Sequence, residues 1–174
     1  MEHQPYTLRL ARKGELPLLQ AVQMAAVKRF YAIGLLQGLD IQPVSLERLQ
    51  DHLEQGGVWV AADAADRPVG FADWFILDGC AHLNELDVLP THGRRGLGQR
   101  LVEQCCRWAC EQRLPAVTLS TFRTVAWNGP FYTRLGFRFL EEHELTPGLQ
   151  HLRILEAQFG LLLTERVCMR RELT

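Results

Sequence analysis

The amino-acid sequence predicts an α/β fold in which a mixed β-sheet is flanked by helices. Strand-like and helix-like segments alternate along the chain, and one helix-like segment separates two strongly apolar strands. The chain has 174 residues, of which 47% are hydrophobic and 22% are charged. This is the composition of an ordinary globular domain with a sizeable core, so we expect residues 1–174 to form a single domain.

The N-terminal half begins with a strand at 7–11, where polar and apolar residues alternate. A helix is expected from 15 to about 31, because its apolar residues recur every three or four positions. A second helix, from 45 to about 54, ends at two glycines. The next two strands, 58–62 and 68–77, are separated by a short polar turn that favours a hairpin.

The C-terminal half continues the alternation with strands at 81–89, 115–122, 136–140 and 167–173. Helices are expected at 97–111 and 130–135, and a helical segment at 146–163 precedes the last strand. The chain passes from strand 81–89 through a helix to strand 115–122. Such a crossover returns in the same direction, so these two strands should be parallel.

Charge and composition narrow the function classes. The formal net charge of −1 at pH 7 provides no overall field for nucleic acid or an anionic membrane. The N-terminus lacks the apolar core of a signal peptide, and no segment has the apolar run of a membrane span, so we expect a soluble cytoplasmic protein. Five cysteines form an odd set without paired metal-ligand spacing. We expect neither a disulfide framework nor a metal site.

A glycine-rich basic turn follows the strand at 81–89 and precedes the helix at 97–111. The first N–H groups of a helix have no intrahelical partner and lie at the positive end of its dipole. Gly93, Gly96 and Gly98 would let phosphate oxygens approach these groups, and Arg94 and Arg95 add charge. The alternative is a plain loop at a helix start, but the glycines and arginines together favour a phosphate site.

Two nucleotide-binding motifs do not fit this turn. A P-loop requires Lys and then Ser or Thr directly after its last glycine, where this chain has Gln99 and Arg100. The dinucleotide motif requires a third glycine where this chain has Leu101. The phosphate therefore belongs to another kind of ligand.

The sequence Val88-Leu-Pro90 followed by Gly96-Leu-Gly98 resembles the signature of the GNAT superfamily of acyl-CoA-dependent N-acyltransferases. Phe131-Tyr132 with the nearby Leu135-Gly136-Phe137 is similar to the family's second motif, and the order of strands and helices matches over essentially the whole chain. The resemblance implies one GNAT-like acetyltransferase domain with a helical insertion at about 146–163. Its sheet would be mostly antiparallel with a splayed central pair of parallel strands, and acetyl-CoA would be its co-substrate.

Two positions depart from the family pattern. Gly93 stands where the family usually has Gln or Arg, so its backbone N–H and Arg94 are expected to replace that side chain. The family's Asn commonly lies seven residues before the Tyr, where this chain has Val125. Asn128 is the candidate instead, although it is an equally good N-cap for the next helix. The resemblance assigns cofactor binding to Leu86, Val88, Gly93, Arg94, Arg95, Gly96, Leu97, Gly98, Asn128 and Tyr132.

The apolar residues of the strand before the turn, Leu83, Leu86 and Val88, change phase around Asn84 and Glu85. A β-bulge would produce this slip. It would splay the strand from its parallel neighbour and free backbone groups to pair with a pantetheine arm, an arrangement for which GNAT proteins are known.

An amine that resembles lysine has a pKa of about 10.4 and must lose a proton before it attacks a thioester. Glu85 is our first candidate for the base, followed by Asp87, His82 or a water chain. The alternative for Glu85 is a solvent-facing or salt-bridged strand residue. By resemblance, Tyr132 is the acid that protonates the departing CoA thiolate, and its alternative is aromatic packing.

The acceptor pocket is expected at the loop between the first two helices and at Trp74 and Arg123, which are candidate substrate contacts. Trp74 would otherwise belong to the core, and Arg123 to the surface. We expect an N-acetyltransferase that moves an acetyl group to a primary amine of a small molecule or peptide by direct attack in a ternary complex.

The competing interpretation is a non-catalytic CoA-binding regulatory or interaction module of the same fold. A third interpretation is nucleic-acid binding through Arg94 and Arg95, which the net charge disfavours. The segment at 146–163 is expected to cover the sheet, or else to form a homodimer contact.

Overall fold

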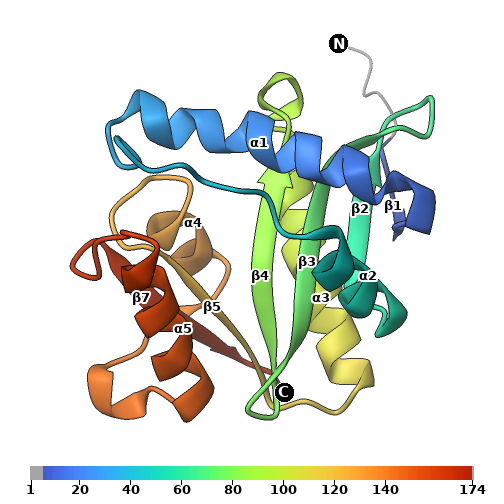
Figure 1. Cartoon of the computed structure of the whole chain (residues 1–174). Coiled ribbons are helices and arrows are strands. Elements are labelled where there is room, and N and C mark those ends of the chain that lie inside the picture. Colours follow the sequence, from blue (N-terminus) through green and yellow to red (C-terminus); the bar gives the residue numbers. More distant parts are fainter. Residues whose placement is uncertain (1–5, 174) are drawn as a thin grey trace. The chain divides into compact units, whose positions relative to one another are not determined.

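The computed structural model describes residues 6–173. Its seven strands form one sheet in the order β1-β2-β3-β4-β5-β7-β6. The strands are β1 (Thr7–Leu10), β2 (Val58–Ala62), β3 (Pro68–Leu77), β4 (Cys80–Val88), β5 (Ala116–Phe122), β6 (Arg138–Phe139) and β7 (Arg166–Glu172). The α-helices are α1 (Leu16–Ala32), α2 (Leu46–Glu54), α3 (Leu97–Glu111), α4 (Gly129–Arg134) and α5 (Pro147–Gln158). Figure 1 shows these elements along the chain.

The chain divides into two compact units. The first unit comprises Met1–Phe75 and Glu85–Cys105, and the second comprises Ile76–Asn84 and Cys106–Thr174. β3, β4 and α3 each begin in one unit and end in the other.

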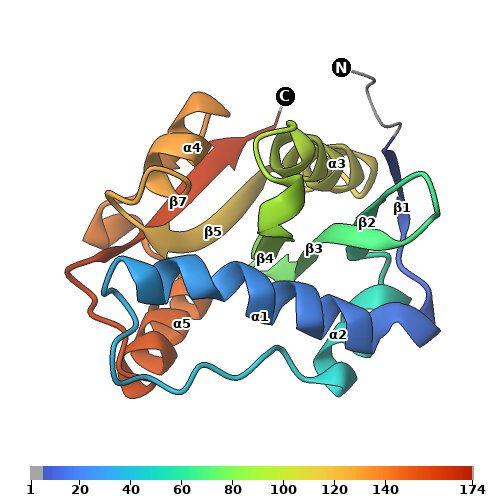
Figure 2. The same ribbon diagram turned by 90° about the horizontal axis from the view of Figure 1, so that it is seen from above.

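The first unit is built on three antiparallel strands. β1 pairs with β2, and β2 pairs with β3 in a register that places Val58 opposite Asp73. α1 and α2 cross one face of these strands (Figure 1), and the beginning of α3 lies on the other face (Figure 2). The core beneath α1 and α2 consists of Ala11, Leu16, Leu19, Val22, Leu49, Val58, Val60 and Phe71.

Local signals explain where α2 begins. The Ser45 hydroxyl oxygen accepts a hydrogen bond from the backbone N–H of Arg48 at 3.2 Å, which satisfies one of the free donors at the helix start. After α2 the chain approaches β3 closely at Gly57, where a Cβ atom would lie 2.1 Å from the backbone oxygen of Trp74. Only glycine fits there, so the end of α2 is fixed against β3.

The second unit begins with the turn between β3 and β4. Asp78 and Gly79 have φ angles of 48° and 74°, the left-handed pair that a two-residue hairpin turn requires. β4 then pairs with β5 in parallel, as the sequence predicts, and β5 pairs with β7 along its whole length. α4 and α5 lie on opposite sides of β5 and β7 (Figure 2).

The predicted helical segment at 146–163 forms a helix only over Pro147–Gln158. Leu149 and Leu152 pack with Cys168 of β7 in a small apolar cluster, so this helix covers the sheet within the second unit. The helix ends before Gly160, whose φ of 86° is left-handed. Phe159 is 73% exposed and does not continue the buried face of the helix.

The predicted fold class, a mostly antiparallel mixed sheet with one parallel pair and flanking helices, is confirmed. Three short 3-10 turns, Lys13–Glu15, Pro90–His92 and Glu142–Glu144, were not predicted because they carry no periodic apolar pattern. Among residues 6–173, no helix is long and apolar enough to cross a membrane.

Candidate active site

β4 leads directly into the glycine-rich turn. The backbone N–H of Leu89 donates to the oxygen of Val69 at 2.8 Å, which holds the end of β4 against β3. A 3-10 turn over Pro90–His92 follows, and α3 begins at Leu97. The predicted sequence of strand, basic turn and helix is therefore confirmed.

Backbone geometry distinguishes the members of this turn. The N–H of Gly93 donates to the oxygen of Pro90 at 3.2 Å, so it closes the 3-10 turn. Gly96 has a φ of 75°, and no heavy atom lies within 4 Å of the position that a Cβ would take. Gly96 therefore leaves open space at the start of α3, where helix N–H groups point outward.

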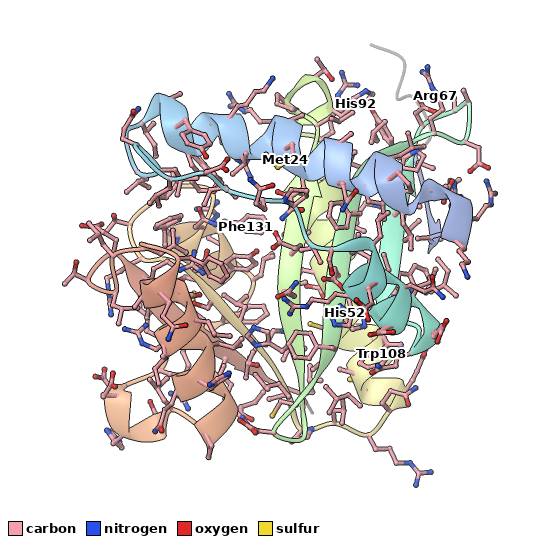
Figure 3. All side chains as sticks on the ribbon, in the orientation of Figure 1. Met24, His52, Arg67, His92, Trp108 and Phe131 are labelled. Atoms are coloured by element: carbon pink, nitrogen blue, oxygen red, sulfur yellow. The ribbon has the colours of Figure 1, made fainter. Side chains whose placement is uncertain are left out.

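Arg94 and Arg95 are both exposed on the turn. Arg94 has a φ of 59°, which costs a non-glycine residue roughly 1–2 kcal/mol. The Arg95 guanidinium lies 6.0 Å from the centre of the Tyr6 ring, and the Tyr6 hydroxyl is hydrogen-bonded to Nδ1 of His92 at 2.9 Å. Tyr6 thus contacts both ends of the basic turn, a role that the sequence alone did not indicate. Figure 3 shows His92 in this turn beyond β4.

Glu85 and Asp87 lie two residues apart on β4, so their side chains share one face of the strand. Asp87 is buried, with 7% of its surface exposed, and Glu85 is half-buried. Burial raises the pKa of Asp87 from its ordinary 3.8 to about 7, although Arg29 of α1 and a side-chain hydrogen bond with Glu85 act in the opposite direction. Sequence reasoning missed Arg29, because nothing in the helical pattern of α1 distinguishes it from a surface residue.

His82, the third candidate for the base, is buried in the second unit. Its Nδ1 is hydrogen-bonded to Oγ1 of Thr118 at 3.0 Å. Burial lowers the pKa of His82 to about 4, so the imidazole is neutral and only weakly basic at neutral pH. These properties favour the β4 carboxyl groups over His82 as the base.

Tyr132 lies on α4 and is only 6% exposed. The centre of its ring is 5.1 Å from that of Phe131 and 5.7 Å from that of Phe137, and both pairs meet edge to face. The aromatic packing that we considered as an alternative is therefore present. It fixes the ring of Tyr132 within the second unit.

Asn128 stands at the N-cap position of α4, but its side chain makes no capping hydrogen bond. The N-cap alternative is thus wrong for the side chain. Its Oδ1 atom is buried and has no hydrogen-bond partner among residues 6–173. A buried amide oxygen without a partner costs about 1–3 kcal/mol, which a donor on a ligand would offset.

The two candidate substrate contacts lie in different surroundings. Trp74 is fully buried in the first unit, as its core interpretation predicts. Arg123 is exposed in the second unit, and its guanidinium lies 5.0 Å from the centre of the Phe139 ring. Among the other predicted cofactor contacts, Leu97 is buried in the core, whereas Leu86 and Val88 are half-buried on β4.

The parallel ladder between β4 and β5 consists of Ala81–Val117, His82–Thr118 and Leu83–Leu119. Both strands continue beyond it, β4 to Val88 and β5 to Phe122. The ladder therefore ends next to Asn84 and Glu85, where the sequence predicts that the pairing is interrupted. The β-bulge itself stays a prediction.

Comparison with known proteins places this geometry in a family. Residues 26–137 match the Acetyltransferase (GNAT) family. The chain belongs to the GNAT acetyltransferase family. It is an acyltransferase enzyme with acetyl-CoA as co-substrate, as the sequence predicts.

Relatives agree with this assignment. The uncharacterized N-acetyltransferase YjcF of Bacillus subtilis strain 168 is 28% identical over 116 residues, which are 66% of this GNAT chain and 81% of YjcF. A GNAT-family acetyltransferase from Staphylococcus aureus Mu50 has a TM-score of 0.76 at 19% identity, over 98% of this chain and 100% of that one.

Two further solved structures contain coenzyme A. The PaiA N-acetyltransferase of Thermoplasma acidophilum, in complex with coenzyme A, has a TM-score of 0.70 at 17% identity, over 97% of this chain and 99% of that one. The N-acetylglutamate synthase of Neisseria gonorrhoeae, in complex with coenzyme A and N-acetylglutamate, has a TM-score of 0.71 at 18% identity, over 99% of this chain and 36% of that one. These likenesses show the GNAT fold.

Proposed function

We propose that this GNAT enzyme transfers the acetyl group of acetyl-CoA to a primary amine of a small molecule or peptide, by direct attack in a ternary complex. The observation that carries the proposal is the pair of carboxyl side chains, Glu85 and Asp87, on the strand that leads into the basic glycine turn. An ammonium group needs a base before it can attack a thioester, and a carboxyl group in a partly buried environment can be that base.

The residues of this chain fit acetyl-CoA. The first backbone N–H groups of α3, with Gly96 leaving space and Arg94 and Arg95 adding charge, would bind the pyrophosphate. The buried Oδ1 of Asn128 would accept a hydrogen bond from an amide of the pantetheine arm. Because the N–H of Gly93 is already bonded to Pro90, we assign its neighbours the larger part in holding the phosphates.

Glu85 and Tyr132 divide the proton transfers between them. Glu85 removes a proton from the acceptor ammonium, and the freed electron pair of the nitrogen attacks the thioester carbon. When the carbon–sulfur bond breaks, the nitrogen loses its second proton to solvent and the CoA thiolate takes a proton from the hydroxyl of Tyr132, which then regains one from solvent. A thiol with a pKa of about 8.5 and a phenol with a pKa of about 10 are close enough for this transfer.

The experiment is a thiol-release assay with acetyl-CoA and a panel of amines that includes amino acids, polyamines and peptides with a free N-terminus. Wild-type protein should release CoA only when an acceptor is present. Tyr132→Phe should lower kcat by about 10²–10⁴-fold, the range of general-acid effects, and leave the Kd of acetyl-CoA within twofold. Wild-type protein that binds acetyl-CoA tightly but releases no CoA with any amine would contradict the proposal.

A further inference from the structure

Tyr6, directly before β1, is bonded to the basic turn and to the elements on both sides of it. Its hydroxyl is hydrogen-bonded to Nδ1 of His92, which Figure 3 labels, at 2.9 Å, and the two rings meet edge to face. Its ring lies 6.0 Å from the Arg95 guanidinium, a distance at which a cation and a ring attract each other. Its backbone oxygen accepts a hydrogen bond from Nη2 of Arg100 in α3 at 3.1 Å. All four residues belong to the first unit.

The sheet fixes the position of Tyr6. Thr7, the next residue, begins β1 and pairs with Ala62 of β2. A residue joined to a paired strand moves less than a residue of a free loop. The half-buried side chain of Tyr6 therefore gives the exposed turn a support that is anchored in the sheet.

The turn needs such a support because its conformation is unfavourable by itself. Arg94 has a φ of 59°, in the left-handed region that disfavours a side chain. Arg94 and Arg95 carry like charges next to each other, and within residues 6–173 neither forms an ion pair with a carboxyl group. The N–H of Arg100 donates to the oxygen of Gly96 at 3.0 Å, so the N–H groups between these residues are the free donors of α3. Strain and charge both oppose the arrangement that would receive a phosphate.

We propose that Tyr6 is a positioning residue for the phosphate groups of acetyl-CoA, because it holds the basic turn in the conformation that receives them and restrains the Arg95 guanidinium. The inference rests on the proposed function, which assigns the pyrophosphate to this turn. A binding site that is ordered for only a fraction of the time has its affinity reduced by that fraction. Tyr6 therefore acts on the affinity for acetyl-CoA and leaves the proton transfers unchanged.

Two variants of Tyr6 separate its contacts. Tyr6→Phe keeps the ring and removes the hydrogen bond to His92, so the Kd of CoA in calorimetry should rise by about two- to tenfold. Tyr6→Leu also removes the ring beside Arg95, which should raise the Kd by about a further two- to fivefold. Leu10→Ala, an exposed residue at the other end of β1, is the matched control and should leave the Kd within about twofold. Pantetheine has the arm of CoA without the phosphates, so its Kd, measured by NMR titration, should be the same in all four proteins.

A double-mutant cycle tests the link between Tyr6 and Arg95. Adding Tyr6→Leu to Arg95→Gln should weaken CoA binding less than Tyr6→Leu does in the wild type, because the ring then has no cation to restrain. In the presence of an acceptor, Tyr6→Leu should raise the KM of acetyl-CoA and leave kcat unchanged. A merely structural role for Tyr6 would lower the affinities for CoA and pantetheine together and would lower kcat.

The inference is overturned if Tyr6→Leu binds CoA as tightly as the wild type, or if CoA and pantetheine lose affinity in the same proportion. Unchanged CoA binding by Arg95→Gln would also overturn it, because Tyr6 would then restrain a side chain that the cofactor does not use. If Tyr6→Leu binds CoA more weakly and pantetheine normally, but the wild type shows no amine-dependent CoA release, the proposed acetyl transfer fails while the positioning role of Tyr6 stands.

Discussion

Replacing Asp87 with Asn should stabilise the protein at neutral and alkaline pH and have little effect in acid. The pKa of Asp87 lies at about 7 in the folded protein, against 3.8 ordinarily. Between these values the folded state binds a proton that the unfolded chain does not. The free energy of unfolding of the wild type therefore falls as the pH rises from about 4 to about 7. Above pH 7 the whole destabilisation by the buried charge of Asp87 is present.

The structure sets an upper bound on the size of this effect. The shift of roughly 3 pH units corresponds to about 4 kcal/mol at 1.36 kcal/mol per unit. Asn has a similar shape and no charge, so it removes this cost. The net gain should be smaller, about 1–3 kcal/mol, because the substitution also removes the counter-charge of Arg29 and changes the side-chain hydrogen bond with Glu85.

Urea denaturation of wild type and Asp87→Asn at several pH values would measure this difference. The two free energies of unfolding should agree at about pH 4 and diverge with Asp87→Asn the more stable by about pH 8. The exposed Asp51→Asn should show no such divergence. A difference that stays constant with pH, or a wild type that gains stability relative to Asp87→Asn as the pH rises, would refute the reasoning.

Three other predictions concern the turn and the two cores. Arg94→Gly should raise the free energy of unfolding by about 1 kcal/mol relative to Arg94→Ala, because the φ of 59° favours glycine. Both variants should bind acetyl-CoA more weakly than the wild type in calorimetry. Unchanged binding would show that Arg94 does not contact the cofactor. Gly57→Ala should destabilise the protein by about 2 kcal/mol or more, since its Cβ would lie 2.1 Å from a backbone oxygen of β3, and unchanged thermal unfolding would contradict this contact. Leu149→Ala should lower the free energy of unfolding by about 2–5 kcal/mol, whereas Ile154→Ala on the exposed side of α5 should lower it by less than about 0.5 kcal/mol. Equal decreases of the two variants in urea denaturation would show that α5 packs differently.

The strands and helices could be predicted where one physical rule decides them. β2 and β3 follow from alternating or continuous apolar residues bounded by turn residues, and their bounds are as predicted. α2 follows from the Ser45 cap. In α5 the apolar spacing continues past the end of the helix, and the left-handed Gly160 stops it at Gln158. The apolar pattern alone could not show whether the helix continues with the apolar residues or ends before the glycine.

The candidate site was predictable only in part, for a physical reason. Glu85, Asp87 and the glycine turn are close in sequence, so their positions follow from β4 and the start of α3. Arg29 comes from a helix more than fifty residues earlier, and its effect on Asp87 depends on tertiary packing. The unpartnered oxygen of Asn128 likewise depends on the local backbone, because sequence favours a helix cap at that position.

Amine-dependent acetyl transfer tests the central claim most directly. Purified protein incubated with acetyl-CoA and the amine panel should form an acetylated amine, detected by mass spectrometry, in one-to-one ratio with released CoA. The yield of wild type should exceed that of Glu85→Gln and Tyr132→Phe at equal acetyl-CoA occupancy. Equal yields from all three proteins, or CoA release without an acetylated amine, would contradict the account.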